Sequence, residues 1–381
     1  MVEQLENINK KVLWDIGTAY DFFISLQILQ FPAKVGLRGA WAAGVRSRLP
    51  QEDRNFLEEV IELFESPYSW IYNLPKPKDV STVLYTLKQT PPAERLRKVF
   101  FPKEENNRIF PYLSLFDELS AKGSWNETDR ENVTREIRVY EQKPKNKWKM
   151  SPKEIERFLN YVSAPAEFGE KYLKALQSYY DVFFAEEERR IAPHLENAIE
   201  EAKEKESKLS FINLLEDLSQ GVRYEKLPKA ENFIFVPSFW LSPLIVDGYP
   251  LEKNKSLWIF GSRPAGESLV PGEIVPDSLL NALKALSDPT RLRILRYLIQ
   301  EQLTPAELSR RLRLRAPTVT HHLHALRLSG LVRFVFKGKH ERLYFARIET
   351  VKAAYANLKE FLEEEEAEAE IIDTPEQRRA F

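Results

Sequence analysis

The chain of 381 residues contains no cysteine. This absence excludes disulfide bonds, thiolate ligands for a metal ion and a cysteine nucleophile. No apolar run approaches the roughly 20 residues needed to span a bilayer. The N-terminal segment, Met1 to Glu6, lacks the basic stretch and the apolar core of a signal peptide. We therefore expect a cytoplasmic protein that has no membrane partner.

The sequence also lacks the motifs of common enzyme classes. It contains no P-loop, no glycine pattern of a dinucleotide site and no nucleophile elbow. Glu187, Glu188 and His194 are the candidates for acid–base chemistry, but their spacing matches no metallohydrolase signature. Adjacent glutamates are typical of a solvated helix face. We expect no enzymatic activity, no catalytic residues and no cofactor.

Positive charge, in contrast, gathers in one short segment. The whole chain has a formal net charge of −1. Residues 288–345 hold twelve basic and four acidic side chains, a net charge of +8, together with four of the five histidines. A local excess of this size on a small helical unit is typical of a nucleic-acid-binding protein.

The remainder of the chain predicts a large aromatic-rich helical part. All seven tryptophans precede residue 260. Apolar residues at helical spacing, such as Phe158, Leu159 and Val162, predict helices along most of this part. After Pro228 the pattern changes, and short aromatic and β-branched runs predict strands at 233–237, 241–246 and 256–260. The expected fold is mainly α with small β elements.

Clear start signals predict short helices in the basic segment. Asp288 is a favourable N-cap before Pro289 at the first helical position. Thr304 is followed three residues later by Glu307, which completes a capping box for a second helix. The apolar residues of a third helix recur at i, i+4 and i+7, at Val319, Leu323 and Leu326.

A hairpin follows the third helix. The runs 332–336 and 343–345 predict two strands, and Gly338 lies in the basic turn between them. A short helix after a tight turn, with small polar and imidazole side chains outward, fits the major groove of B-DNA. In this arrangement the hairpin reaches the flanking backbone or minor groove.

These elements give a set of candidate DNA contacts. Thr320 and His321 are suited to base edges and the arginines to phosphates, whereas His322 is expected to pack inside. In the recognition helix and the turn before it, the candidates are Arg313, Arg315, Thr318, Thr320, His321, His324 and Arg327. In the hairpin, the candidates are Arg333, Lys337, Lys339, His340 and Arg342.

The same segment resembles a known family. Residues 283–295, LKALSDPTRLRIL, resemble the opening of the ArsR-type winged helix-turn-helix repressors. Residues 318–326, TVTHHLHAL, with the Gly-Leu-Val at 330–332, are similar to the recognition helix and wing entry of that family. The resemblance covers about residues 277–347. It implies a dimeric repressor with dimer contacts from residues 278–287 and about 349–362.

The sequence departs from the family in three places. Arg315, followed by Ala316 and Pro317, stands where the family usually has a serine cap and then an amide side chain used for base contact. The family's thiolate metal site is impossible without cysteine. Its His/Asp metal site on the last helix has no counterpart, because residues 348–366 contain no histidine. We therefore expect no bound metal.

These patterns divide the chain into four parts. The upstream part weakly resembles a domain of unknown function that is fused to such modules in bacteria. We expect a mainly helical effector or dimerisation domain at 1–228, a short β-rich segment packed on it at 229–272, a winged helix-turn-helix domain with a C-terminal dimerisation helix at 277–366, and an acidic flexible tail at 367–381.

The sequence thus predicts a homodimeric, sequence-specific transcription regulator that binds double-stranded DNA at an inverted-repeat operator. By resemblance it is a repressor, and its N-terminal domain senses an unknown small-molecule effector or dimerises. Two alternatives remain open: a protein-interaction module tethered to DNA, and a small-molecule enzyme with an accessory DNA-binding domain. A deep aromatic pocket with convergent polar groups would favour an effector. A flat apolar patch would favour a partner protein.

Overall fold

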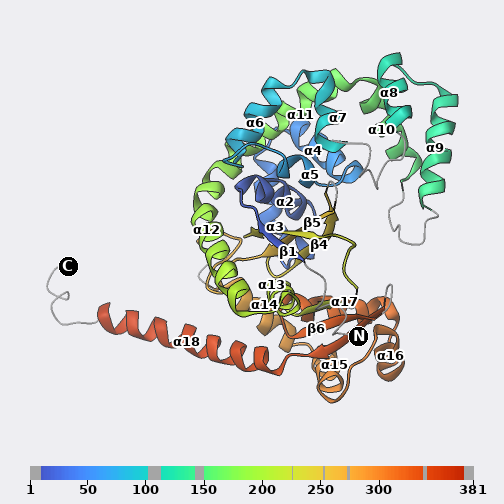
Figure 1. Ribbon diagram of the computed structural model, residues 1–381. Helices are drawn as coiled ribbons and strands as arrows, with labels where there is room; N and C mark the ends of the chain where they lie inside the picture. Colours follow the sequence, from blue (N-terminus) through green and yellow to red (C-terminus); the bar gives the residue numbers. More distant parts are fainter. Residues whose placement is uncertain are drawn as a thin grey trace.

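The computed structural model describes residues 10–101, 113–141, 150–224, 226–251, 254–272, 275–337 and 341–372. Figure 1 shows a curved body of helices around a small sheet, a second unit beneath it, and one long helix that extends away from that unit. This mainly helical fold with small β elements confirms the predicted fold class. No helix of these ranges combines the length and the apolar character that crossing a membrane requires.

The N-terminal body, as we call residues 10–218 and 226–272, consists of helices that surround one sheet. The first helices are α2 (Thr18–Gln30), a 3-10 turn η1 (Pro32–Lys34), α3 (Gly39–Ser47), α4 (Gln51–Leu63), α5 (Tyr68–Tyr72), α6 (Val80–Gln89), α7 (Pro92–Phe100), α8 (Leu113–Lys122) and α9 (Glu127–Glu141). They are followed by α10 (Pro152–Ser163), α11 (Pro165–Tyr179), a π-helical turn η3 (Tyr180–Phe184), α12 (Ala185–Lys208) and α13 (Phe211–Leu218).

The sheet of the body has the strand order β1-β3-β5-β4. Strands β1 (Lys11–Trp14), β3 (Asn232–Ser238) and β5 (Lys255–Gly261) are parallel, and β4 (Ile245–Pro250) runs antiparallel to β5. The predicted strands at 233–237 and 256–260 are confirmed. The one at 241–246 is displaced, because Leu244 N donates to Leu241 O and closes a turn before β4 begins.

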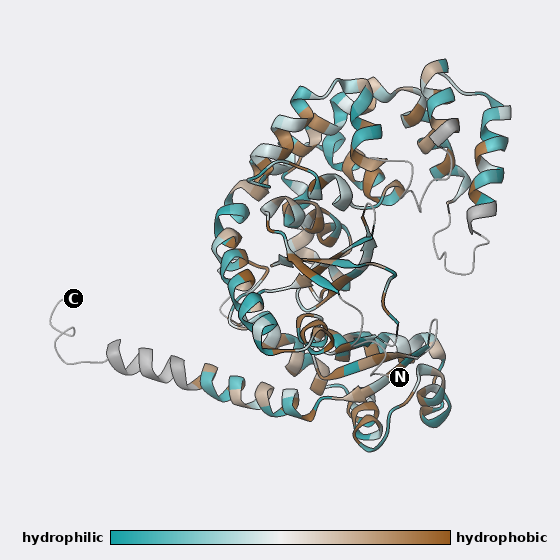
Figure 2. Ribbon diagram, viewed as in Figure 1, coloured by the Kyte–Doolittle hydropathy of each residue, from teal (hydrophilic) through white to brown (hydrophobic). Residues whose placement is uncertain are grey.

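Helices cover both faces of this sheet, as parallel strands require. Successive side chains of a strand point to opposite faces. Ile234 and Val236 of β3 therefore join the core formed by α2 to α11, whereas Phe233 and Phe235 pack with residues of α12 and α13. Figure 2 shows these central strands as the apolar centre of the molecule.

The second unit has its own hydrophobic core. Its helices are α14 (Asp277–Leu286), α15 (Pro289–Gln300), α16 (Pro305–Leu312), α17 (Ala316–Leu328) and α18 (Ile348–Ile372). Its strands β6 (Val332–Lys337) and β7 (Glu341–Ala346) form the predicted antiparallel hairpin. The helix starts at Asp288 and at Thr304 are confirmed, since each side chain accepts a hydrogen bond from the backbone three residues on.

A third strand from far upstream completes the hairpin sheet. Strand β2 (Val222–Tyr224) pairs in parallel with β6, and Val222 is buried in the core of the second unit. The predicted boundary at residue 228 therefore falls on the wrong side of this strand. We call β2 together with residues 275–372 the C-terminal unit. In that unit α18 continues to Ile372, so residues 367–372 are helical and the remainder of the predicted flexible tail lies outside the described residues.

Candidate nucleic-acid interface

Helices α16 and α17 meet at a tight turn. The backbone of Arg313 adopts the left-handed conformation, with φ of 56°, and Leu314 N donates to Ser309 O at 3.0 Å to close the end of α16. Helix α17 then starts at Ala316, with Pro317 in its first turn. Val319 is fully buried in the core, which fixes which side of α17 faces outward. This arrangement of two helices and a turn matches the predicted geometry.

The first half of α17 presents an open polar face. Thr318, Thr320 and His321 are exposed, and so are Arg313 and Arg315 in the turn before the helix. The Thr320 hydroxyl donates to Ala316 O at 3.0 Å, which leaves its oxygen lone pairs facing solvent. Neither arginine makes an ion pair within the described residues. Five predicted contact residues are thus brought together on one accessible surface.

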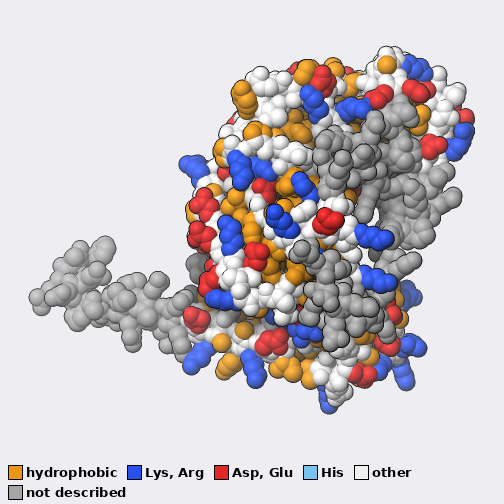
Figure 3. Space-filling view, in the orientation of Figure 1, with side chains coloured by type: hydrophobic (Ala, Val, Ile, Leu, Met, Phe, Trp, Pro, Cys, Tyr) orange, Lys and Arg blue, Asp and Glu red, His pale blue; other side chains and the backbone are white. Residues whose placement is uncertain are grey.

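Three acidic side chains of the C-terminal unit, Glu307, Asp288 and Glu301, are already engaged. Glu307 accepts from Thr304 N at 2.8 Å and Asp288 accepts from Arg291 N at 2.8 Å, and these backbone hydrogen bonds lower the pKa of both carboxyl groups. Glu301 forms an ion pair with Arg311. Because the carboxylates cap helices or bind a neighbouring guanidinium, they neutralise little of the charge at the turn. Figure 3 shows Lys and Arg side chains spread along the lower right margin, over this unit.

The second half of α17 lies against the N-terminal body. The imidazole of His324 faces the backbone carbonyls of Ala33 and Lys34 in η1. Burial on that side lowers the pKa of His324 and these carbonyls oppose the shift, although part of the side chain stays exposed. His324 is therefore placed at a contact between the two parts, beside the open face.

The predicted phosphate contact of Arg327 is wrong in this arrangement. The side chain is only 6% exposed. Its guanidinium donates to Gln220 O at 2.9 Å and to Ser219 O at 2.7 Å, at the corner between α13 and β2. Burial lowers the pKa of Arg327 to about 10, so the group remains a cation at neutral pH. The reason for the error is that a helix-period pattern cannot show a partner that lies about a hundred residues upstream.

Two further arginines extend this contact. We call the set of contacts that Arg327, Arg333 and Arg347 make with residues 216–220 the seam. Arg333 of β6 donates to Glu216 of α13 at 3.1 Å, and Arg347 reaches Gln220 O at 3.5 Å. The acceptor side of the seam could not be predicted from the sequence, because α13 and the three-residue strand β2 carry no motif. The only local signal is the alternation of Val222, Arg223 and Tyr224, which is too short to predict a strand.

The remaining hairpin candidates are less well defined. Arg342 is an exposed residue, and its guanidinium carbon lies over the rings of Phe334 and Phe336, 4.9 and 5.5 Å from their centres. Lys337 ends β6, but its side chain lies outside the described residues, as do Lys339 and His340 entirely. The contacts predicted for these three residues stay predictions.

His322 packs inside the unit, as predicted. Its Nδ1 is 3.8 Å from the Asp288 carboxylate, and the side chain is 15% exposed. Burial lowers the pKa of His322 despite the nearby carboxylate. Among the described residues, no three His, Asp or Glu side chains lie close enough together to hold a metal ion.

The acid–base candidates of the body serve structural contacts. Glu187 is 2% exposed and accepts from Trp240 Nε1 at 2.9 Å and from Arg190. Glu188 accepts from the Thr18 hydroxyl and from Val80 N. With these oxygens already bonded, neither carboxylate is placed as a free general base.

Comparisons with known proteins concern only the end of the chain. A family model described as a helix-turn-helix domain matches residues 286–334. Among solved structures, an ArsR-like transcriptional regulator from a Rhodococcus species is 29% identical, with a TM-score of 0.22, over 25% of this chain and 86% of its own. Reduced HlyU from Vibrio cholerae is 31% identical, with a TM-score of 0.18, over 21% of this chain and 83% of its own. NolR from Sinorhizobium fredii is 25% identical, with a TM-score of 0.19, over 22% of this chain and 83% of its own. No curated protein matches the chain.

Proposed function

We propose that this chain, whose C-terminal unit carries an ArsR-like helix-turn-helix domain, is a sequence-specific transcription regulator that acts as a repressor in the cytoplasm. The observation that carries the proposal is the open face of α17. Thr320 and His321 lie exposed beside two arginines that have no ion pair among the described residues. Small polar groups on a helix suit base edges, and unpaired guanidinium groups suit phosphates.

A dimer would place two such faces on one DNA duplex. Helix α18 packs on α14 and then extends away from the unit (Figure 1). Its apolar side chains include Tyr355, 73% exposed, and Leu362, 53% exposed, and Leu283 of α14 is 37% exposed. Apolar side chains on a projecting helix gain most free energy when a second copy covers them. We propose that α14 and α18 form a two-fold dimer.

Two-fold symmetry specifies the DNA site. Paired recognition helices enter successive major grooves about 34 Å apart, which requires an inverted repeat with half-sites one helical turn apart. Occupying such a site over a promoter represses transcription. The N-terminal body would release or strengthen this binding if an effector had unequal affinity for its DNA-competent and incompetent forms.

Selection of bound DNA from a random pool tests this function directly. The full chain should enrich an inverted repeat whose two halves are separated by about one turn of DNA. A control selection with Arg313, Arg315 and His321 all replaced by alanine should enrich nothing. Failure of the unaltered chain to enrich any sequence, at low salt and with a folded protein, would overturn the proposal.

A further inference from the structure

One segment of the N-terminal body carries positive charge and no acid. Residues 22–51 form most of α2, the turn η1 and helix α3, and they contain no aspartate or glutamate. The chain as a whole has a net charge of −1. The basic residues of this segment are Lys34, Arg38, Arg46 and Arg48. A stretch of positive charge at a protein surface attracts a polyanion.

Lys34 of η1 is available to a charged partner. Its side chain is exposed and forms no ion pair with a described residue. Its Nζ lies 4.2 Å from the centre of the exposed Phe31 ring, a contact that leaves the charge at the surface. Arg46, in contrast, is held within the body, because its Nη1 donates to Gln30 and Glu58 at 2.7 and 3.0 Å. The charge of Lys34 is therefore open to an anion that approaches η1.

The turn η1 lies at the edge of the open face of α17. His324 comes three residues after His321 and four after Thr320, so the three side chains share one side of the helix. The imidazole of His324 faces the backbone carbonyls of Ala33 and Lys34. A rise of about 1.5 Å per residue puts this contact roughly 5 Å along the axis from the proposed base contacts. The body thus lies within about one helical turn of the residues that face DNA.

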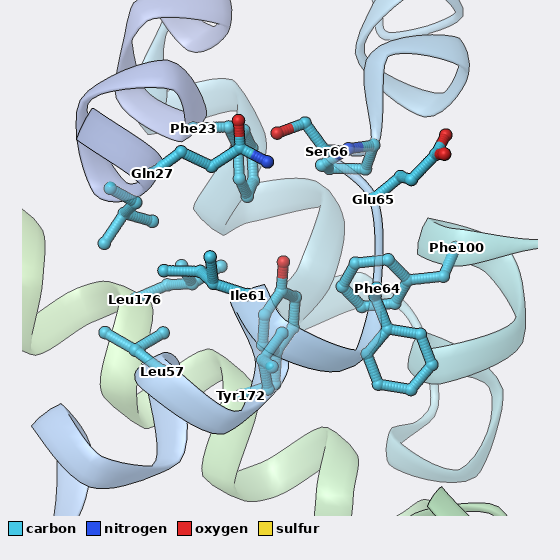
Figure 4. A pocket seen from close by; sticks show the side chains of 13 residues that line it. Phe23, Gln27, Leu57, Ile61, Phe64, Glu65, Ser66, Phe100, Tyr172 and Leu176 are labelled. Carbon is cyan, nitrogen blue, oxygen red and sulfur yellow. The ribbon is translucent and has the colours of Figure 1, made fainter. Parts of the chain in front are cut away.

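Contacts on two sides hold η1 in this position. Gly36, two residues after η1, lies against α14, where an added Cβ would be 3.1 Å from the Asn281 side chain. Helix α14 in turn packs on α17. On its other side η1 follows α2, which packs closely in the body. Figure 4 shows Phe23 and Gln27 of α2 and Ile61 of α4 around a space of about 30 Å³, with room for about one water molecule. The turn therefore meets DNA as a fixed part of the surface.

The dimensions of B-DNA decide what η1 meets. The major groove is about 12 Å wide, and an α-helix with its side chains is about 10–12 Å across. A recognition helix therefore fills the groove, and the phosphates of both groove walls lie beside it. A segment that packs at the edge of the outward face of the helix meets these phosphates. An acidic segment at this place would repel DNA, whereas Lys34 supplies a charge that attracts it.

We propose that η1 is a second DNA-binding surface, in which the Lys34 ammonium binds a backbone phosphate beside the bases that α17 contacts. The inference rests on the proposed function, because it requires DNA on the open face of α17. The partner is the sugar-phosphate backbone of a B-form duplex, so this contact carries no sequence information. It lengthens the DNA site beyond what the C-terminal unit covers and makes the N-terminal body a part of the DNA-binding surface.

The first experiment measures the effect of the charge. Lys34→Ala in the full chain removes one phosphate contact per subunit, so the salt dependence of binding should fall by about one unit per subunit. At about 0.15 M salt such a contact contributes roughly fivefold in affinity, and operator and random DNA should lose the same factor. Fluorescence anisotropy at several salt concentrations measures both quantities. Lys88→Ala is the matched control and should change neither, since Lys88 is an exposed lysine of α6, a helix far from α17 in Figure 1.

The second experiment measures proximity to DNA. The chain contains no cysteine, so Lys34→Cys creates a single attachment point for an iron–EDTA reagent that cuts nearby DNA backbone. On end-labelled operator DNA, the labelled protein should cut beside each half-site, outside the bases that α17 covers. Lys88→Cys, labelled in the same way, should leave the DNA intact.

The outcomes separate this surface from the proposed function. Operator binding by the unaltered chain supports the proposed function whatever the result at position 34. In such a protein, an unchanged affinity of Lys34→Ala, an effect that Lys88→Ala equals, or DNA left uncut from position 34 would overturn the surface. A higher affinity of Lys34→Ala would also overturn it, since η1 would then obstruct DNA. Absence of DNA binding by the unaltered chain would overturn the proposed function, and the surface with it.

Discussion

Arg95 of the N-terminal body and two arginines of the C-terminal unit lie in opposite environments. In the N-terminal body, Arg95 is 4% exposed and donates to the carbonyls of Leu87, Thr90 and Gly169. At the turn of the C-terminal unit, Arg313 and Arg315 are exposed and make no ion pair with a described residue. A cation that holds a fold needs matched acceptors, whereas a cation that binds a polyanion needs to be open. Packing, and not residue type, decides between the two roles.

Arg327 shows that buried and exposed arginines are not separated along the sequence. It lies in the recognition helix, among the predicted DNA contacts, and yet it is held in the same way as the buried arginines of the body. At the seam, an arginine of the helix that also carries the open polar face is buried and hydrogen-bonded to backbone carbonyls.

The dimer surface should give the largest effect. Tyr355→Asp places a charge on the exposed apolar face of α18, so sedimentation should show a monomer. The affinity for an inverted repeat should fall by roughly 100-fold or more, because the second half-site is no longer tethered. Asn357→Asp, on another side of the same helix, is the control and should remain dimeric. A Tyr355→Asp protein that stays dimeric and binds normally would disprove this surface.

Arg327→Ala tests the buried class of arginine. Removing the guanidinium leaves the Ser219 carbonyl without its donor and the Gln220 carbonyl with only the longer contact from Arg347, so the free energy of unfolding should fall by about 2–4 kcal/mol. Urea denaturation followed by tryptophan fluorescence measures it. Arg315→Ala should change the same quantity by less than about 0.5 kcal/mol. Equal effects of the two changes would mean that the seam does not stabilise the protein.

Thr320→Ala and His321→Ala test direct readout. Each should reduce the discrimination between operator and random DNA by about 1–3 kcal/mol if it removes a base contact. Competition binding with labelled operator measures this ratio. Thr320→Ser, which keeps the hydroxyl, should retain most of the discrimination. If neither alanine substitution changes the ratio, other residues recognise the base sequence.

Arg313→Ala and Arg315→Ala test the open class of arginine. Each should weaken operator and random DNA alike and reduce the salt dependence of binding by about one unit per lost phosphate contact. Fluorescence anisotropy from low to high salt gives the slope. Arg333→Ala is the comparison, since Arg333 is already bonded to Glu216, and its slope should change less. The same loss is expected for Lys337→Ala and Lys339→Ala.

His322 should give the smallest effect. Because burial lowers its pKa in the folded protein, the unfolded chain binds the proton more readily. Stability that is fully present above pH 6.5 should therefore decline as the pH falls through 6.5 toward the lower folded pKa. Asp288 affects stability in a separate pH range. Because its pKa is lowered in the folded protein, its contribution to the free energy of unfolding is lost only when the pH falls below the ordinary value of 3.8. Urea midpoints from pH 8 to pH 5 should slope less for His322→Gln, and an unchanged slope would contradict the assignment.

Local signals predicted much of the C-terminal unit. The starts at Asp288 and Thr304 were predictable because the capping side chain and the backbone N–H that donates to it lie three residues apart. The side of α17 that faces the core was predictable from Val319 and the apolar residues that recur with it at helical spacing, which is again a local pattern. The strands 233–237 and 256–260 were predictable because they are apolar on both faces and bounded by turn residues.

Contacts between segments that are far apart in the chain could not be predicted from the sequence. Strand β2 has three residues, and its partner β6 begins at Val332, more than a hundred positions later. Strand β1 was missed for the same reason, since it pairs with β3 across the whole helical body. Arg327 was misassigned because its acceptors are backbone carbonyls, which every residue possesses and no motif marks.

Strand β2 also determines which fragments of the protein can be studied. A polypeptide cut at residue 277 would keep every helix-turn-helix residue but would lose the strand that covers one side of β6. The exposed peptide groups of Val332 to Lys337 would then offer a free edge to neighbouring molecules, a common cause of aggregation. It would also lose Ser219 and Gln220, the acceptors of Arg327. A cut that preserves a sound DNA-binding fragment must therefore fall before α13, or the long upstream part must stay attached.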